Sequence, residues 1–284
     1  MLWKGGRRSD NVEDRRGMGV ARGAKLGVGT VILALVAMYF GVDPSIILNQ
    51  GMLEPTTSQV TPAGPPAGQD PLADFVSVVL ADTEDVWNAQ FQALGTAYRE
   101  PALVLFSGAV QSACGFAEAA MGPFYCPRDQ KVYIDLEFYR DLKERHQAPG
   151  DFAQAYVIAH EVGHHVQTLL GISEKVRQRS SQASEADANR LSVRQELQAD
   201  CFAGFWAHHA QRSRQILEEG DIEEALTAAS AIGDDRLQQQ GRGYVTPDSF
   251  THGTSAQRVE WFRRGFRTGS LEQCNTFQAA ALSD

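Results

Sequence analysis

The chain has 284 residues, 43% of them hydrophobic, which is enough for one or two ordinary globular domains and excludes a disordered protein. Its formal net charge is −9, but residues 1–25 carry seven Lys/Arg against three Asp/Glu, so the rest of the chain carries −13. Such an acidic remainder argues against nucleic acid as the main partner.

The basic segment at residues 1–25 precedes the most apolar stretch of the chain. Residues 26–42, LGVGTVILALVAMYFGV, contain no charged side chain, and continuing to Leu48 brings the stretch close to the roughly 20 residues that cross a bilayer. We therefore predict a transmembrane anchor at residues 26–48. Because the basic residues precede it, the N-terminus is expected in the cytoplasm and the rest of the chain on the periplasmic side of the inner membrane. A cleaved signal peptide is the alternative, but its basic region would be unusually long and no A-x-A pattern closes the apolar run.

Residues 49–71 are dense in Pro, Gly, Thr and Ala and offer few apolar side chains to bury. This composition predicts a linker between the membrane and a domain at residues 72–284. Within that domain the pattern is mainly helical, with a short apolar run and one hairpin. The expected elements are a helix at 72–98, a strand at 102–106, hairpin strands at 124–126 and 131–135, helices at 151–170, 189–219 and 255–267, and an exposed polar stretch at 173–188.

The four cysteines, Cys114, Cys126, Cys201 and Cys274, all follow residue 100. Beyond a membrane, disulfides are expected, and three pairings are open. A Cys114–Cys126 bond would close a short loop and leave Cys201 to pair with Cys274. A thiolate zinc site is disfavoured because no two cysteines have CxxC-like spacing.

The stretch VIAHEVGHHVQTLL, residues 157–170, contains an HExxH pattern. On a helix, His160 and His164 lie one turn apart on the same face, with Glu161 beside that face. Two imidazoles so arranged can bind one zinc ion, and the carboxylate can take a proton from a metal-bound water. Apolar residues around the pattern predict a buried helix, and Gly163 allows a neighbouring element to approach closely.

A catalytic zinc site needs a third protein ligand. The HExxHxxGxxH pattern is rejected, because Gln167 stands in place of the glycine and Leu170 in place of the histidine. Glu196 is the best third ligand, and Asp200, one turn later, would accept the free N–H of His160. The alternative, a solvated acidic helix face, fits poorly with the apolar CFAGFWA that follows. Weaker candidates are Glu174, Glu185, Glu218 and His208, while His165 and His209 are interpreted as packing or surface residues. A di-iron site would need a second ExxH, which the sequence lacks.

Several motifs resemble the neutral zinc metallopeptidases of bacterial membranes. They are NVEDRRG (11–17), SACG (112–115), GPFYCP (122–127), VYID (132–135), HEVGHHVQ (160–167), ELQADCFAG (196–204) and THGTSAQR (251–258). The resemblance implies a mainly helical α+β, zincin-like domain with a small β-sheet, zinc held by His160, His164 and Glu196, and Glu161 as general base. It also implies that Asp200 supports a ligand. A looser similarity, to membrane peptidases of the heat-shock and prenyl-protein-processing type, has a histidine six residues before an arginine. It makes His252 a candidate hydrogen-bond donor to the tetrahedral oxyanion.

The sequence therefore predicts a membrane-anchored zinc peptidase that acts on a peptide or protein substrate. In such enzymes an edge strand beside the active-site helix commonly holds the substrate backbone, although a hairpin that only supports the core would fit the 124–135 region equally well. Two other functions stay open. One is a binding or scaffolding domain stabilised by metal without catalysis, and the other is an amidase that acts on cell-wall amides.

Overall fold

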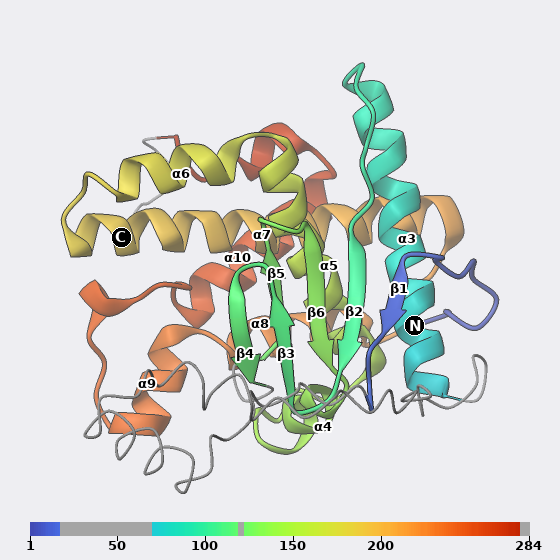
Figure 1. Ribbon diagram of the computed structural model, residues 1–284, viewed down its shortest axis with the longest axis horizontal. Helices are drawn as coiled ribbons and strands as arrows, with labels where there is room; N and C mark the ends of the chain where they lie inside the picture. The colour runs from blue at the N-terminus through green and yellow to red at the C-terminus, as the bar shows by residue number, and fades with distance from the viewer. Residues whose placement is uncertain (18–69, 119–121, 279–284) are drawn as a thin grey trace, which may run out of the picture. The chain divides into compact units, whose positions relative to one another are not determined.

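A computed structural model of the chain describes residues 1–17, 70–118 and 122–278. It is a mainly helical α+β fold with a small sheet, as predicted (Figure 1). The described elements, in chain order, are β1 (Val12–Asp14), α3 (Pro71–Ala93), β2 (Ala102–Phe106), β3 (Ala109–Ser112), β4 (Gly115–Glu118), β5 (Phe124–Cys126), β6 (Lys131–Asp135), α4 (Glu137–Glu144), α5 (Asp151–Leu169), α6 (Ile172–Ser180), α7 (Glu185–Arg214), α8 (Asp221–Ala231), α9 (Asp234–Arg242), η2 (Pro247–Ser249), α10 (Ser255–Thr268) and η3 (Leu271–Cys274).

Four of the strands form one sheet in the order β1–β2–β6–β5. Strand β2 is parallel to both of its neighbours, whereas β5 and β6 are antiparallel and form the hairpin expected from the sequence. The apolar run of β2 is buried from Leu103 to Phe106, as expected for an inner parallel strand that is covered on both faces. Strand β5 lies at an edge of the sheet.

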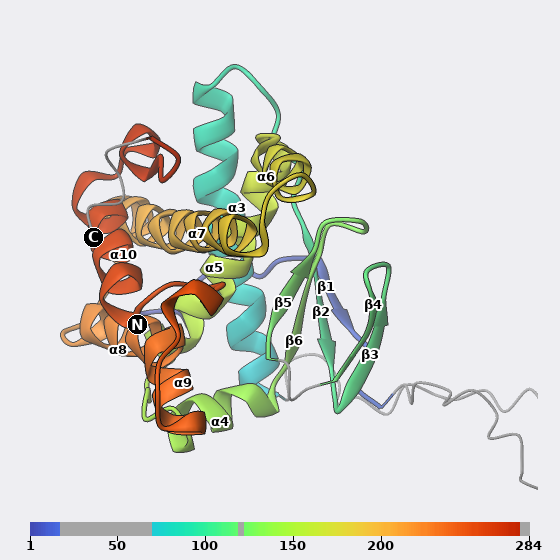
Figure 2. The ribbon, with the colours of Figure 1, turned by 90° about the vertical axis from the view of Figure 1, so that its left-hand side faces the viewer.

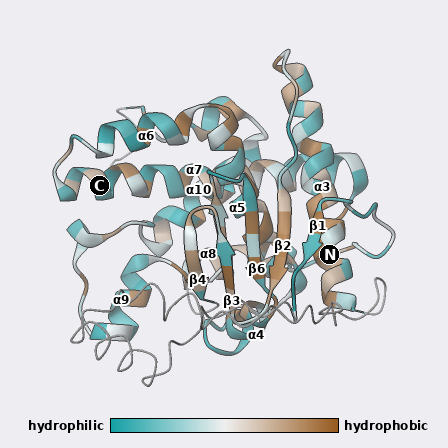
Figure 3. Ribbon diagram, viewed as in Figure 1, coloured by the Kyte–Doolittle hydropathy of each residue, from teal (hydrophilic) through white to brown (hydrophobic). Residues whose placement is uncertain are grey.

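The sheet is covered by helices on one face and by a small hairpin on the other. Figure 2 shows α3 and α5 on one side of the strands and the antiparallel pair β3–β4 on the opposite side. The larger apolar cluster joins Leu103 and Leu105 of β2 to the helices, while Val104 and Phe106 pack toward the hairpin. Alternate residues of one strand thus serve two cores. The central strands are accordingly hydrophobic, while α6 is largely hydrophilic (Figure 3).

Helix α5 is buried along most of its length and crosses α7 at very short range. A Cβ atom added at Gly163 would lie 3.1–3.2 Å from backbone atoms of Ala199, so the glycine permits the close approach that the sequence suggested. Gly204, also on α7, permits a second close contact between helices. Its neighbour is the carbonyl of Phe262 on α10, so it brings α7 against α10 instead of α5.

Two disulfides are present, Cys114–Cys126 and Cys201–Cys274. They close sequence separations of 12 and 73 residues, which in the chain-entropy treatment stabilise the fold by about 3 and about 4 kcal/mol. The first ties the β3–β4 hairpin to edge strand β5. The second ties α7 to the C-terminal turn η3.

Residues 1–15 belong to the same compact unit as the helical domain. Strand β1 pairs with β2, and the buried Glu84 of α3 accepts hydrogen bonds from the side chains of Arg7, Ser9 and Asn11. At the opposite end of this segment the amino group of Met1 lies 2.6 Å from Asp151 at the start of α5. The N-terminal residues thus pack against the domain and contribute a strand to its sheet.

This packing contradicts the single-pass inner-membrane location predicted from the sequence, which is therefore wrong. That prediction put residues 1–25 and residues 72–284 on opposite sides of a bilayer, but β1 and β2 are hydrogen-bonded in one sheet. The predicted anchor at 26–48, and the linker up to residue 69, lie outside the described residues. Within the described ranges, no helix is both long and apolar enough to span a membrane.

Candidate metal centre

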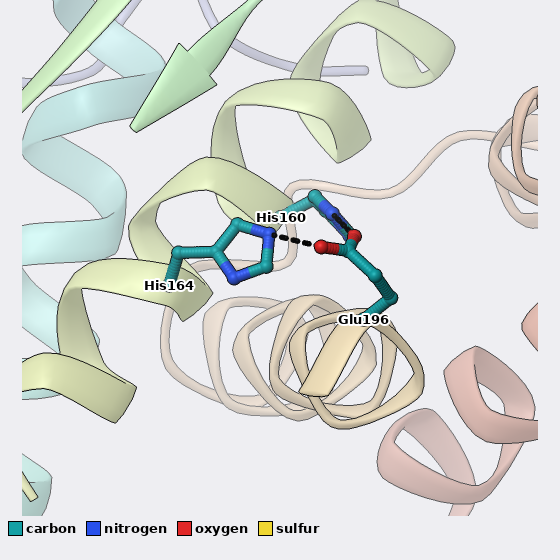
Figure 4. A group of neighbouring side chains, drawn as sticks. All are labelled: His160, His164 and Glu196. Atoms are coloured by element: carbon teal, nitrogen blue, oxygen red, sulfur yellow. Dashed lines mark hydrogen bonds and ion pairs between the residues drawn. The ribbon is translucent and has the colours of Figure 1, made fainter. Parts of the chain in front are cut away.

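Three of the predicted site residues meet between α5 and α7. His160 and His164 project from successive turns of α5, and Glu196 faces them from α7 (Figure 4). The Nε2 atom of His160 lies 3.1 Å from Oε2 of Glu196, and the Nε2 atom of His164 lies 3.4 Å from Oε1. The ligand atoms of these residues all lie within 4.8 Å of one another, so one ion can contact all three.

The other nitrogen of each imidazole is already occupied. Nδ1 of His160 lies 2.8 Å from Oδ1 of Asp200, and Nδ1 of His164 lies 2.9 Å from Oε1 of Gln167. Both partner atoms can only accept, so each Nδ1 carries the hydrogen and donates it. Each Nε2 therefore faces Glu196, and when it is deprotonated it offers a lone pair to the space that it shares with the carboxylate.

The close contact between the imidazoles and the carboxylates shifts the pKa values of all three groups so that their charged forms are favoured. Burial lowers the pKa of His160, but Asp200 and Glu196 outweigh burial and raise it to about 10. Burial also lowers the pKa of His164, and Glu196 raises it above its ordinary value. Burial would raise the pKa of Glu196, yet the two histidines hold it well below its usual range. The two imidazoles and the carboxylate thus stabilise one another's charged forms.

The donor set fits zinc. Zinc bonds of about 2.0–2.1 Å in tetrahedral geometry place neighbouring ligand atoms about 3.3 Å apart. The separations of 3.1 and 3.4 Å between the histidine Nε2 atoms and the Glu196 oxygens match that spacing. Two histidines and one carboxylate are also the ligand set of a class of catalytic zinc sites, and all three residues line the cleft described below.

Asp200, expected behind His160, lies in a fully buried network. Its carboxylate accepts hydrogen bonds from His160, from the hydroxyl of Tyr156 and, at 2.9 Å through both oxygens, from Arg258. Burial would raise the pKa of Asp200, but the charges of Arg258 and His160 keep it below its ordinary value. Arg258 is only 2% exposed, so this is a buried ion pair. Tyr156 was missed at the sequence level, and Arg258 was noted only for its spacing from His252.

A cleft of about 640 Å³ opens beside the three residues. Glu161 lines it, and its carboxylate has no hydrogen-bond partner among the described residues. Phe124 and Tyr125 of edge strand β5 form part of the same wall. The cleft thus brings together a carboxylate able to accept a proton, a candidate cation site and a strand edge.

His252 also lines this cleft, with its side chain about half exposed. Asp234 fixes the loop that carries it, because one carboxylate oxygen accepts the backbone N–H groups of Thr251, His252 and Gly253. The other oxygen lies 3.3 Å from Nδ1 of His252. This hydrogen bond raises the pKa of His252, against burial, which lowers it. Asp234 was not among the predicted residues.

The weaker ligand candidates lie elsewhere. Glu174 bonds to Arg177 on the surface of α6, Glu185 is exposed at the start of α7, Glu218 contacts the Met1 amino group, and His208 bonds to the carbonyl of Phe266. His165 is a packing residue, as interpreted, and it contacts Tyr125 and the carbonyl of Arg99.

A family model described as "Putative neutral zinc metallopeptidase" matches residues 1–277. The chain is 54% identical over 287 residues to "Uncharacterized protein YpfJ" of Escherichia coli (strain K12), covering 98% of this chain and 99% of that protein. It is 41% identical over 259 residues to "Uncharacterized protein Rv2575" of Mycobacterium tuberculosis (strain ATCC 25618 / H37Rv), covering 87% and 86%. No solved structure gives a significant match.

Proposed function

Since the chain belongs to the neutral zinc metallopeptidase family, we propose that it hydrolyses peptide bonds at a zinc centre formed by His160, His164 and Glu196. The observation that carries the proposal is the pair of Nε2 atoms that face one carboxylate, while each Nδ1 donates its hydrogen to another side chain. Such a donor set has the composition and spacing that zinc prefers.

A zinc ion bound there supplies Lewis acidity, which polarises a carbonyl group and lowers the pKa of a water molecule to about 7. The remaining chemistry belongs to the side chains. Glu161 follows the ligand His160 directly and has no competing hydrogen bond from the described residues, so its carboxylate takes a proton from the attacking water and returns it to the departing amine.

Two further parts of the cleft support a peptide substrate. Among the described residues β5 pairs with β6 alone, so an extended peptide can add to its outer edge by main-chain hydrogen bonds and cross the cleft. Asp234 contacts Nδ1 of His252 and raises the pKa of this histidine, which favours the imidazolium form. In that form Nε2 also carries a hydrogen, which it can donate to the carbonyl oxygen as negative charge develops there.

The proposal is tested by metal content and proteolysis together. The purified full chain should bind one zinc per molecule, digest casein, lose this activity after dialysis against a chelator and regain it on adding zinc. His160→Ala and Glu196→Ala should each lose the zinc, whereas His208→Ala, a histidine remote from the centre, should keep it. A wild-type protein that binds zinc but cleaves neither casein nor a peptide library would refute the peptidase assignment. Cleavage of peptidoglycan amides instead would identify an amidase.

His252→Gln is expected to lower kcat/KM by about 100–1,000-fold, the usual effect of losing one donor to a developing oxyanion, while zinc content stays the same. Asp234→Asn should lower the rate in the same direction, because the loop that positions His252 loses the charge that gathers its N–H groups. Steady-state kinetics on a defined peptide measure both effects. A His252→Gln enzyme with wild-type kcat/KM would exclude the role.

A further inference from the structure

Two buried glutamines connect His164 to the C-terminal turn. Gln167 is 0% exposed and Gln198 is 4% exposed, on α5 and α7 respectively. The Nε2 atom of Gln167 lies 2.7 Å from the carbonyl oxygen of Gln195 and 3.1 Å from Oε1 of Gln198. The Nε2 atom of Gln198 lies 3.0 Å from the carbonyl oxygen of Cys274. Neither glutamine enters the chemistry proposed above.

Backbone carbonyls determine the direction of each hydrogen bond in the series that connects Cys274 to His164. A carbonyl oxygen can only accept, so the amide nitrogen of Gln198 must face Cys274, and its oxygen must face Gln167. The amide nitrogen of Gln167 must likewise face the carbonyl of Gln195, which leaves its oxygen for His164. That oxygen requires a hydrogen on Nδ1 of His164, and Nε2 is left as the electron-pair donor.

The far end of the chain of hydrogen bonds is firmly held. Cys274 is bonded to Cys201 on α7, and the hydroxyl of Thr276 donates to the carbonyl of Arg194, at 2.6 Å. The carbonyl of Cys274 therefore has a fixed position relative to α7, the helix that also carries Glu196. Through their hydrogen bonds, the two glutamines hold the ring of His164 on α5 in a fixed orientation relative to this turn.

We propose that Gln167 and Gln198 are positioning residues that fix the tautomer and ring orientation of His164 for metal binding. Asp200, a charged group, supports His160 in the same way. His164 is supported instead by two neutral side-chain amides in series, the second of which is hydrogen-bonded to the disulfide-bonded turn η3. The inference rests on the metal-binding part of the proposed function and is independent of what the centre cleaves.

The test is the zinc affinity of Gln167→Met, which keeps the length of the side chain and removes both of its hydrogen-bonding functions. Competition with a chromophoric chelator should show zinc binding weakened about 10–100-fold, the usual cost of losing a group that supports a ligand. Gln198→Met should weaken binding less, because Gln167 keeps its bond to Gln195. The double variant should bind zinc no more weakly than Gln167→Met alone, since both act through one path. Gln182→Met, on the exposed stretch after α6, is the matched control and should bind as the wild type does.

Urea unfolding of the metal-free variants separates positioning from general damage, because a purely structural role lowers stability without changing the zinc affinity of the folded molecules. If Gln167→Met does not fold, Gln198→Met alone decides by the same affinity measurement. Zinc affinity within twofold of the wild type in a folded variant would overturn the proposal. A wild-type protein that binds no zinc would refute the metal centre and, with it, the positioning role. A wild-type protein that binds zinc without cleaving peptides would refute only the peptidase activity, and the affinity measurements would still support the positioning role of the two glutamines.

Discussion

Glu161→Gln is expected to lower kcat/KM for peptide hydrolysis by about 100–10,000-fold while the enzyme keeps one zinc per chain. The change replaces a carboxylate by an amide of the same shape, so the cleft loses its proton acceptor and little else. Since Glu161 makes no hydrogen bond to the described residues, the substitution breaks none of their hydrogen bonds. A variant that loses activity but keeps its zinc therefore distinguishes loss of the general base from loss of the metal.

The measurement is steady-state hydrolysis of a defined peptide, with zinc determined on the same samples. Glu219→Gln is a suitable control, because it removes the same charge from a side chain that is exposed in the loop before α8. If Glu161→Gln retained wild-type cleavage, the general-base role and the mechanism built on it would be refuted.

Arg258→Met is expected to lower the free energy of unfolding by about 3–5 kcal/mol, the usual cost of leaving one member of a buried ion pair without its partner. Arg258 donates to both oxygens of Asp200 from α10, and both residues are almost inaccessible to solvent. Methionine fills similar volume but leaves the Asp200 carboxylate with His160 and Tyr156 as its remaining donors.

Urea unfolding of the metal-free protein measures this loss. Arg263→Met, on the exposed face of the same helix, should change stability by less than about 0.5 kcal/mol. Adding Asp200→Asn to Arg258→Met should cost less than the sum of the two single changes, because the stranded charge is removed. If Arg258→Met lowered the free energy of unfolding by less than about 1 kcal/mol, the buried ion pair between Arg258 and Asp200 would be refuted.

The elements that the sequence predicted best are those with strong local patterns. The helices bearing HExxH and Glu196 have long apolar faces, and the hairpin at 124–135 has a clear turn, so their positions follow from periodicity and spacing. Spacing also sufficed to pair Glu196 and Asp200 with the histidines, because residues four apart share one helix face.

What the sequence could not predict depends on contacts between distant segments. Strand β1 has only three residues, two of them acidic, and it exists because β2 pairs with it. Gln167 was read only as a departure from another motif, since nothing local reveals that it faces His164. Tyr156 and Asp234 likewise acquire a role only when the helices and the loop at 251–253 meet. The apolar run at 26–42 led to the incorrect prediction of an inner-membrane location, because nothing in the local sequence of residues 12–14 reveals that they pair with β2.

The pairing of β1 also constrains the order in which this protein folds. Val12 is paired with Leu103, and Met1 contacts Asp221, so the segment that carries β1 is synthesised well before the residues that it contacts. Contacts that span such long separations form slowly, because a large loop must close before they are gained. Seating of the N-terminal strand is therefore expected to be a late step of folding. Until it happens, the outer edge of β2 is an unpaired strand edge open to association with other chains.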